Sequence, residues 1–230
     1  IMIFISEIGM NYNGNFSLIY ELIKQSKLSG ADICKFQLGW RDKPGEINQL
    51  DLKKVNQIIK WCEYFNTEPM FSIISKKAYE IFKKTKLKKI KIASRSLKYD
   101  YDLVKKIVKE NPEKKIYISL GMWENVDLPF NNKNIDYFFC VSKYPCFAED
   151  LLNLPKKFSK NKLIGYSDHT MGIDTCLLAI SRGAAVIEKH FTLNKSDMTI
   201  RDHALSATPE EFRNLVNLGR EINKKISKGV

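Results

Sequence analysis

Short apolar runs alternate with amphipathic stretches along most of the chain. Eight of the apolar runs are strand-like. The expected strands span residues 3–8, 32–38, 69–74, 89–93, 115–120, 136–141, 162–166 and 185–190. Strands that alternate with helices favour a parallel sheet, because parallel neighbours need crossover connections. Eight parallel strands are also the number that closes a (β/α)8 TIM barrel, so the pattern predicts an α/β barrel in a single domain.

The expected helices lie between these strands and show apolar positions at helical spacing. Near the end of the chain, Thr208, Pro209 and Glu211 supply an N-cap, a first-turn proline and a capping-box acid. The apolar stripes that follow this spacing are Leu52, Val55, Ile58, Ile59, Cys62 and Phe65, then Leu103, Val104, Ile107 and Val108, and finally Phe212, Leu215, Leu218, Ile222 and Ile226. Between the fifth and sixth strands, MWENVDLPFNNKN is too short and too rich in turn formers for a full helix, which predicts an abbreviated crossover.

Composition narrows the classes of function. A chain of 230 residues with 44% apolar content can bury one large core. No apolar stretch approaches the roughly 18 to 20 residues that cross a bilayer, so we expect a cytoplasmic protein without a membrane partner. Five cysteines without a CxxC pair indicate neither a disulfide framework nor a sulfur zinc site. The net charge of +12 suggests an anionic partner, but no stacking motif accompanies the paired lysines, so nucleic-acid binding is not expected.

The residues that end the expected strands are unusually polar. In a barrel of this kind the active site lies at the carboxyl ends of the strands, so these positions hold the candidate chemistry. They are Glu7 with Asn11 and Asn13, Lys35 with Gln37, Ser72, Lys91 with Ser94, Ser119 with Gly121, Ser142 with Tyr144, Ser167 with Asp168 and His169, and Glu188 with His190.

Lys35 and Lys91 would be costly inside a barrel without an anion. Serine hydroxyls near them favour a phosphate or carboxylate pocket. The alternative is that each lysine pairs with a buried acid such as Glu7 or Glu188, and the two interpretations can coexist.

All three histidines fall in the last third of the chain. His169 and His190 would end neighbouring strands, whose backbones lie roughly 4.8 Å apart, so both imidazoles could bind one divalent cation such as manganese, zinc or iron. The alternative is that each histidine donates to a neighbouring carboxylate. His203, beside Asp202, is interpreted as a supporting group or a substrate contact.

Several segments, in this order, resemble the sialic acid synthase (N-acetylneuraminate synthase) family. GYSDHT followed by EKHFTL is the most specific of them. The segments that carry the resemblance are EIGMNYNG (7–14), SGADICKFQ (29–37), KIAS (91–94), ISLGM (118–122), SKYP (142–145), GYSDHT (165–170), GAAVIEKHFTL (183–193) and DHALS (202–206). Members of the family condense phosphoenolpyruvate with N-acetylmannosamine or a related amino sugar.

The resemblance implies a carbon–carbon bond-forming transferase of carbohydrate biosynthesis that acts as a homodimer. It implies that His169 and His190 bind a divalent metal, usually Mn²⁺, and are catalytic together with Glu7. It assigns phosphoenolpyruvate to Lys35, Lys91, Ser94, Ser119 and Ser167. Glu7, Gln37, Tyr144 and Asp202 would face the sugar or move protons.

The sequence departs from the family pattern at Tyr12, Ile73, Leu120 and Phe139, and its loop of residues 39–50 is short. We expect one barrel domain over residues 1–230, without the small C-terminal antifreeze-like domain of typical members. The predicted function is condensation of phosphoenolpyruvate with an amino sugar to give a sialic-acid-type nonulosonic acid and phosphate. The alternatives are condensation with another aldehyde sugar, or a catalytically degenerate barrel that serves as a binding or assembly subunit.

Overall fold

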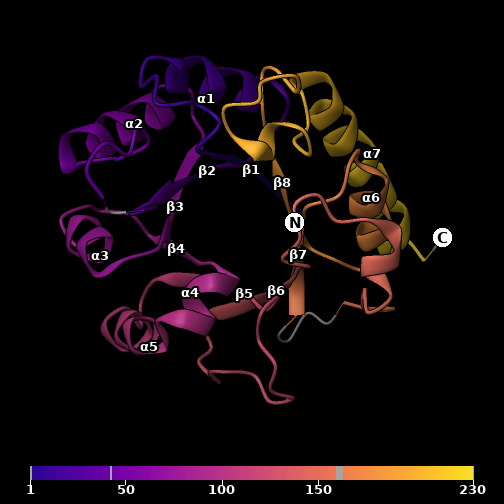
Figure 1. Cartoon of the computed structure of the whole chain (residues 1–230). Helices are drawn as coiled ribbons and strands as arrows, with labels where there is room; N and C mark the ends of the chain where they lie inside the picture. The colour runs from indigo at the N-terminus through magenta and orange to yellow at the C-terminus, as the bar shows by residue number, and fades with distance from the viewer. Residues whose placement is uncertain (1, 42, 159–162, 230) are drawn as a thin grey trace.

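Eight parallel strands close into a barrel in which each strand pairs with the next along the chain and β8 pairs with β1. The structure is a computed structural model that describes residues 2–41, 43–158 and 163–229. Figure 1 looks along the barrel and shows the helices as an outer ring around the strands. The predicted single-domain α/β barrel is therefore confirmed.

Each expected strand forms, and its ends differ from the expected ones by one or two residues at most. The strands are β1 (Ile3–Gly9), β2 (Ile33–Leu38), β3 (Glu68–Ile73), β4 (Lys89–Ile92), β5 (Lys115–Ser119), β6 (Ile135–Phe139), β7 (Leu163–Asp168) and β8 (Val186–His190). Lys162, expected to begin the seventh strand, lies outside the described residues.

The helices cover the outer face of the strands. They are α1 (Leu18–Leu28), α2 (Leu52–Tyr64), α3 (Lys76–Phe82), α4 (Ser94–Tyr99), α5 (Tyr101–Glu110), α6 (Asp174–Ser181) and α7 (Pro209–Ser227), with short 3₁₀ turns η1 (Ala148–Leu151) and η2 (Arg201–His203). The predicted capping box of α7 forms, because the Thr208 hydroxyl accepts from the Glu211 N–H and the Glu211 carboxylate accepts from the Thr208 N–H. Leu218 lies off the buried face and is 50% exposed. Gly219 takes its place, at a close approach to Phe4 and Ile180 that leaves no room for a larger side chain.

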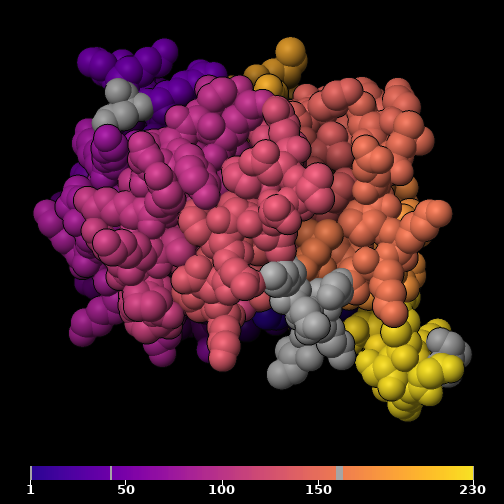
Figure 2. Space-filling view, turned by 90° about the horizontal axis from the view of Figure 1, so that it is seen from below, coloured from indigo at the N-terminus to yellow at the C-terminus, as the bar shows by residue number. Residues whose placement is uncertain are grey.

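The crossover between β5 and β6 contains no α-helix, as the turn-rich sequence predicts. Aromatic side chains cover the strands there instead: Trp123 and Phe130 stack on Tyr101 with ring centroids 5.8 and 5.7 Å away. The Tyr137 hydroxyl fixes the segment by donating to the Phe130 carbonyl at 2.7 Å. Figure 2 looks at the molecule from this side, where residues coloured from magenta to orange form most of the surface. Among the described residues, the β6–β7 crossover also lacks an α-helix and carries only η1.

The interior of the barrel changes from apolar to polar along the strand direction. Successive side chains of a strand point to opposite faces, so every second residue faces inward. Toward the amino ends the inward residues form an apolar cluster of Ile5, Ile33, Met70, Tyr117, Phe138 and Val186. Two residues further along most of these strands stand Glu7, Lys35, Ser72, Ser119 and Glu188, all of them buried. The barrel interior is therefore filled by an apolar layer toward the amino ends of the strands, and a polar chamber lies above it at their carboxyl ends.

Within the described part of the chain, no helix has the length and apolar character needed to cross a membrane.

Candidate active site

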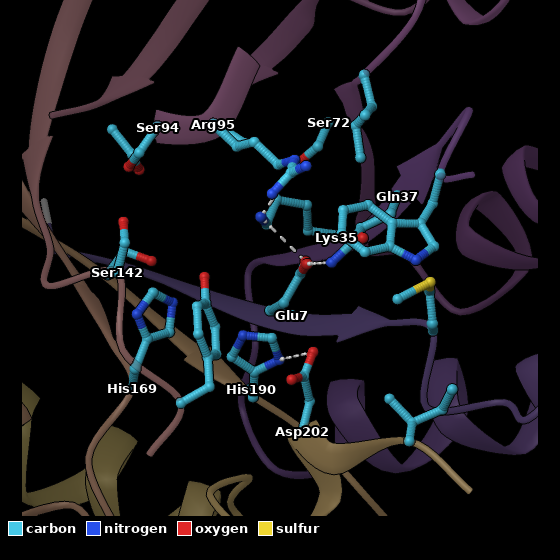
Figure 3. Close-up of a pocket in the computed structure, with 18 of the residues that line it drawn as sticks. Glu7, Lys35, Gln37, Ser72, Ser94, Arg95, Ser142, His169, His190 and Asp202 are labelled. Carbon is cyan, nitrogen blue, oxygen red and sulfur yellow. Dashed lines mark hydrogen bonds and ion pairs between the residues drawn. The ribbon is translucent and has the colours of Figure 1, made fainter. Parts of the chain in front are cut away.

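A cavity of about 840 Å³ opens at the carboxyl ends of the strands. All eleven residues that the sequence assigns to the site line it: Glu7, Lys35, Gln37, Lys91, Ser94, Ser119, Tyr144, Ser167, His169, His190 and Asp202. Figure 3 shows how several of them converge from different strands. The structure thus brings together residues up to 195 positions apart in the chain (202 − 7); the roles assigned to them stay predictions.

A buried charge cluster forms the floor of this cavity. The Lys35 ammonium lies 3.1 Å from Glu7 Oε2 and 3.1 Å from Glu188 Oε1. Lys91 donates to both oxygens of Glu188, at 2.9 and 3.1 Å. The Ser167 hydroxyl adds a third donor to Glu188, at 2.7 Å from Oε1. Both lysines therefore have buried acid partners, which confirms the structural alternative without excluding an anion pocket.

The cluster is stabilised by mutual attraction, because burial alone would discharge its members. Burial would raise the pKa of Glu188, but Lys35 and Lys91 together hold it below its ordinary range. Burial raises the pKa of Glu7 to about 7, although Lys35 opposes the shift. Burial also lowers the pKa of Lys91, whereas two neighbouring carboxylates raise the pKa of Lys35 above its ordinary value. Glu188 is therefore the firmly ionised centre of the group.

The serine hydroxyls of the cavity differ in how far their hydrogen bonds are satisfied. Ser72 accepts from Lys35 at 3.2 Å. The Ser94 hydroxyl accepts from the Gly121 N–H at 3.1 Å and lies 3.1 Å from the Cys140 thiol. Ser119 is 3% exposed, and its hydroxyl has no hydrogen-bond partner among the residues that the structure describes. A buried hydroxyl without a partner is costly, so Ser119 is the group best placed to receive a ligand atom.

His169 and His190 stand side by side at the rim, with ring centroids 5.5 Å apart. His169 Nδ1 lies 2.6 Å from the Val141 carbonyl, so this nitrogen carries the proton and Nε2 keeps its lone pair. Burial lowers the pKa of His169 to about 4 and that of His190 to about 3. Both rings are therefore neutral at neutral pH, which is the form that binds metals.

Two observations fit a divalent cation at this pair. The rings are close and neutral, and His190 Nδ1 is buried, 3.9 Å from Asp202 Oδ2, with no hydrogen-bond partner in the described ranges of the chain. Among the described residues, no group of three or more His, Cys, Asp or Glu side chains is arranged to hold a metal. A cation bound by the two imidazoles would take its other ligands from water or substrate.

Polar and aromatic groups complete the wall beside the histidines. The Tyr144 ring packs 4.2 Å from the His169 ring, and the Arg201 guanidinium lies 4.6 Å from the Tyr144 centroid. Gln37 donates to Glu7 Oε1 at 3.4 Å. Burial raises the pKa of Asp202 above its ordinary value. These contacts hold the side chains of Tyr144, Arg201 and Gln37 in the wall of the cavity, where a polyhydroxylated ligand would contact them.

The sequence analysis missed the lining residues that lie beyond the strand ends. The cavity wall also includes Trp40, Arg41, Arg95 and Arg201. Arg95 comes one residue after Ser94, and Arg41 lies in the loop after β2. The signal that could have revealed them is the presence of arginines in the segments that follow strands, since these segments build the active-site face of a barrel.

Asp168, which the sequence places at the rim, faces outward, away from the cavity. It pairs with Lys189 at 2.5 Å, and both side chains are fully buried. Lys189 also donates to the Thr170 carbonyl at 2.5 Å, and Tyr166 donates to Asp168 at 2.7 Å. Since Asp168 precedes His169 and Lys189 precedes His190, this ion pair joins β7 to β8 directly behind the two histidines.

His203 supports the loop architecture. Its Nδ1 lies 2.6 Å from the Thr192 hydroxyl and its Nε2 lies 2.7 Å from Asn13 Oδ1, so both nitrogens are engaged. The ring lies outside the cavity lining. The position agrees with a supporting group, and a contact between His203 and substrate stays a prediction.

The four departures from the family pattern lie outside the cavity lining. Tyr12 is buried and donates to the Asn48 carbonyl at 2.7 Å, and Phe139 stacks on Tyr166. Ile73 is buried in the outer core, and Leu120 packs against the same core. These four substitutions therefore lie in the shell around the site, whereas Ile74, the residue after Ile73, lines the cavity.

Comparisons with known proteins agree with this geometry. A family model described as the NeuB family matches residues 46–230. A protein of Methanocaldococcus jannaschii is 35% identical over 98% of this chain and 72% of its own length. An N,N'-diacetyllegionaminic acid synthase of Campylobacter jejuni is 32% identical over 98% of this chain and 78% of its own length.

Among solved structures, an N-acetylneuraminic acid (sialic acid) synthetase of Leptospira borgpetersenii, in complex with citrate, superposes with a TM-score of 0.80. It is 22% identical, and the match covers 98% of this chain and 85% of that one. At this identity the superposition supports the fold alone. The family match and the sequence relatives carry the assignment further: the chain belongs to the NeuB family and is a sialic-acid-synthase-like transferase that forms a carbon–carbon bond.

Proposed function

We propose that this enzyme condenses phosphoenolpyruvate with N-acetylmannosamine or a related amino sugar, giving a sialic-acid-type nonulosonic acid and phosphate. The observation that carries the proposal is that one cavity holds two adjacent neutral histidines and the buried cluster of Lys35, Lys91 and Glu188. The cations of such a cavity would bind an anionic donor substrate. A metal ion held by the two histidine nitrogens would bind the oxygen of an acceptor substrate. The legionaminic acid synthase among the relatives supports the same reaction type.

In this proposal, phosphoenolpyruvate lies over the charge cluster. Lys35, Lys91 and the hydroxyls of Ser94, Ser119 and Ser167 bind its phosphate and carboxylate groups. Glu188 keeps the lysine ammonium groups in place before the substrate arrives, so little reorganisation accompanies binding. Ser119 gains the hydrogen bond that it lacks.

The acceptor sugar binds toward the histidines, in its open-chain aldehyde form. His169 and His190 would hold a divalent cation, which we propose to be Mn²⁺; when bound, it would polarise the aldehyde oxygen. Gln37, Tyr144 and Asp202 line this side of the cavity and would orient the sugar hydroxyls and amide group. The Val141 carbonyl fixes the ring of His169.

The chemistry proceeds in the order that these positions allow. Carbon 3 of phosphoenolpyruvate bonds to the aldehyde carbon, whose oxygen takes a proton and becomes a hydroxyl. Water then adds to the cationic carbon 2 and loses one proton, which leaves a hydroxyl on that carbon. Phosphate leaves with the electrons of its C–O bond and takes up the hydroxyl proton, which gives the keto acid. Glu7 contacts Lys35 at 3.1 Å beside the reacting carbons and would accept or return the proton.

A turnover assay tests the proposal. The purified chain is incubated with phosphoenolpyruvate, Mn²⁺ and a panel of amino and neutral aldehyde sugars, and both phosphate release and keto-acid product are measured. Equimolar phosphate and nonulosonic acid with an amino sugar would support it. Product with a neutral aldehyde sugar alone would transfer the assignment to the synthases of deoxy-sugar acids. Lack of turnover with every acceptor, in a folded protein that binds Mn²⁺, would overturn it.

A further inference from the structure

Arg95 is a cation of the cavity that no part of the proposed mechanism uses. It follows Ser94 in α4, directly after β4, and it lines the cavity. Figure 3 shows its side chain extending into the pocket from the same side as Ser72 and Lys35. The guanidinium carbon lies 5.2 Å from the centroid of the Tyr99 ring, one helical turn further on, and this contact steadies the side chain.

Arg95 lacks an acidic partner in the part of the chain that the structure describes, in contrast to three other cations of the cavity. Lys35 and Lys91 are held by Glu7 and Glu188, and Arg201 lies 3.5 Å from Asp202. Within the ranges that the structure describes, no carboxylate lies within ion-pair distance of Arg95, and its guanidinium donates no hydrogen bond. Its charge is therefore available to a ligand.

A second observation points to an anion at the same part of the rim. Ser119 is buried, and within the described residues its hydroxyl has no hydrogen-bond partner. Strands β4 and β5 pair through Ile92 and Ile118, so the residues that follow them, Ser94 with Arg95 and Ser119, reach one edge of the cavity. The guanidinium of Arg95, from α4, and the hydroxyl of Ser119, from the end of β5, thus line one cavity.

We infer that Arg95 and Ser119 form a subsite for a phosphate monoester. The planar guanidinium matches two phosphate oxygens with two parallel N–H donors, and the serine hydroxyl donates to the third. The inference rests on the proposed function for its ligands, of which two carry this group. One is phosphoenolpyruvate, and the other is an acceptor sugar that bears a phosphate.

Equilibrium binding tests the subsite and separates the two ligands. Isothermal titration calorimetry in EDTA, which prevents turnover, measures the dissociation constants of phosphoenolpyruvate, N-acetylmannosamine 6-phosphate and N-acetylmannosamine. The proteins compared are the wild type, Arg95→Gln, Arg95→Lys and Ser119→Ala. The matched control is Arg213→Gln, which removes an exposed arginine from α7, outside the cavity. Thermal melting of each variant establishes that it is folded.

We expect Arg95→Gln to weaken binding of one phosphate ligand by roughly 10- to 100-fold, the loss typical of a charge-assisted contact. Arg95→Lys should lose less, because it keeps the charge without the two parallel donors. Weaker phosphoenolpyruvate binding would place the donor phosphate in the subsite. Weaker binding of the sugar phosphate alone would place the acceptor phosphate there. Binding of N-acetylmannosamine should not change.

Dissociation constants of both phosphate ligands within twofold of wild type in Arg95→Gln would overturn the inference and leave the proposed function standing. A wild-type chain that binds neither phosphate ligand would overturn both. An equal loss of affinity in Arg213→Gln would show that net charge, and not the subsite, controls binding, and would also overturn the inference.

Discussion

Glu188 holds the polar chamber together at the scale of single residues. It accepts from Lys91 and Ser167 and contacts Lys35, so one carboxylate serves two buried ammonium groups. Glu7 forms its ion pair with Lys35. The two lysines therefore differ in what their loss would do: without Lys35, Glu7 loses its partner, whereas without Lys91, Glu188 keeps Lys35.

Lys91→Met is consequently the cleaner probe of donor binding. We expect it to raise the dissociation constant of phosphoenolpyruvate at least tenfold, since it removes a buried cation that faces the ligand. The melting temperature should fall by less than in Lys35→Met, which leaves a buried carboxylate unpaired. Calorimetry and thermal melting measure the two effects. An unaltered affinity for phosphoenolpyruvate would exclude Lys91 from the donor site.

His203 gives the stability of the fold a dependence on pH. Burial lowers its pKa below the ordinary value of 6.5, with Asp197 and Asp202 opposing the shift. Its neutral form is therefore favoured in the folded state, and its contribution is fully present above pH 6.5. As the pH falls below 6.5, His203 binds a proton in the unfolded chain but stays neutral in the folded protein. The free energy of unfolding therefore decreases.

Thermal melting at pH 7.5 and pH 5.0 should show a larger loss of stability for the wild type than for His203→Gln. The glutamine does not titrate, so the difference between the two proteins isolates His203 from the other histidines. Parallel losses in the two proteins would show that the ring titrates normally.

At the scale of elements, the Asp168–Lys189 ion pair fixes β7 to β8. The two residues pair in the strand register, and their side chains lie between the barrel and its outer layer with no solvent exposure. Burial would raise the pKa of Asp168, but Lys189 and the hydrogen bonds of Tyr166 and Thr170 lower it below its ordinary range. The register of these strands sets the relative position of His169 and His190.

Lys189→Met should destabilise the protein by about 3–5 kcal/mol, because it leaves a buried carboxylate without its cation. Asp168→Asn combined with Lys189→Met removes both charges, and it should recover part of that loss. Denaturant unfolding measures both values. A double mutant no more stable than Lys189→Met would show that the pair contributes through more than charge compensation.

The elements were readable from the sequence, because apolar runs and capping signals are local. The α7 capping box of Thr208 and Glu211 is such a signal, and the turn-rich segment after β5 is another. The outward direction of Asp168 could not be read in the same way. Two residues that end one strand face opposite sides, and only the closed barrel decides that His169 faces inward and Asp168 outward.

The site was predictable where residues end strands, and less so where loops supply them. Arg95 and Arg41 lie beyond the strand ends, and their place in the cavity wall depends on how the chain turns after each strand. The pairing of Lys35 with Glu7 and Glu188 was foreseen only as an alternative, because the sequence shows which residues carry charge and not which of them meet.

At the scale of the whole molecule, the cavity is a binding site whose occupation should stabilise the fold. A ligand at 100 times its dissociation constant adds about 2.7 kcal/mol to the free energy of unfolding. Mn²⁺ should therefore raise the melting temperature of the wild type by a few degrees. His190→Ala should melt close to the wild type without metal and show no such rise. A full Mn²⁺ shift in His190→Ala would exclude the histidine pair as the metal site.

The expected homodimer stays a prediction, which sedimentation would check.

The crossover between β5 and β6 is one of two places where the described residues cover the barrel without an α-helix. Three stacked aromatic rings and the hydroxyl of Tyr137 do the covering there. Such a cover has fewer backbone hydrogen bonds than a helix and can lift without unfolding its neighbours. Amide protons of β5 and β6 should therefore exchange with deuterated water sooner than those of β1 and β2. This part of the barrel would then be the first to open locally.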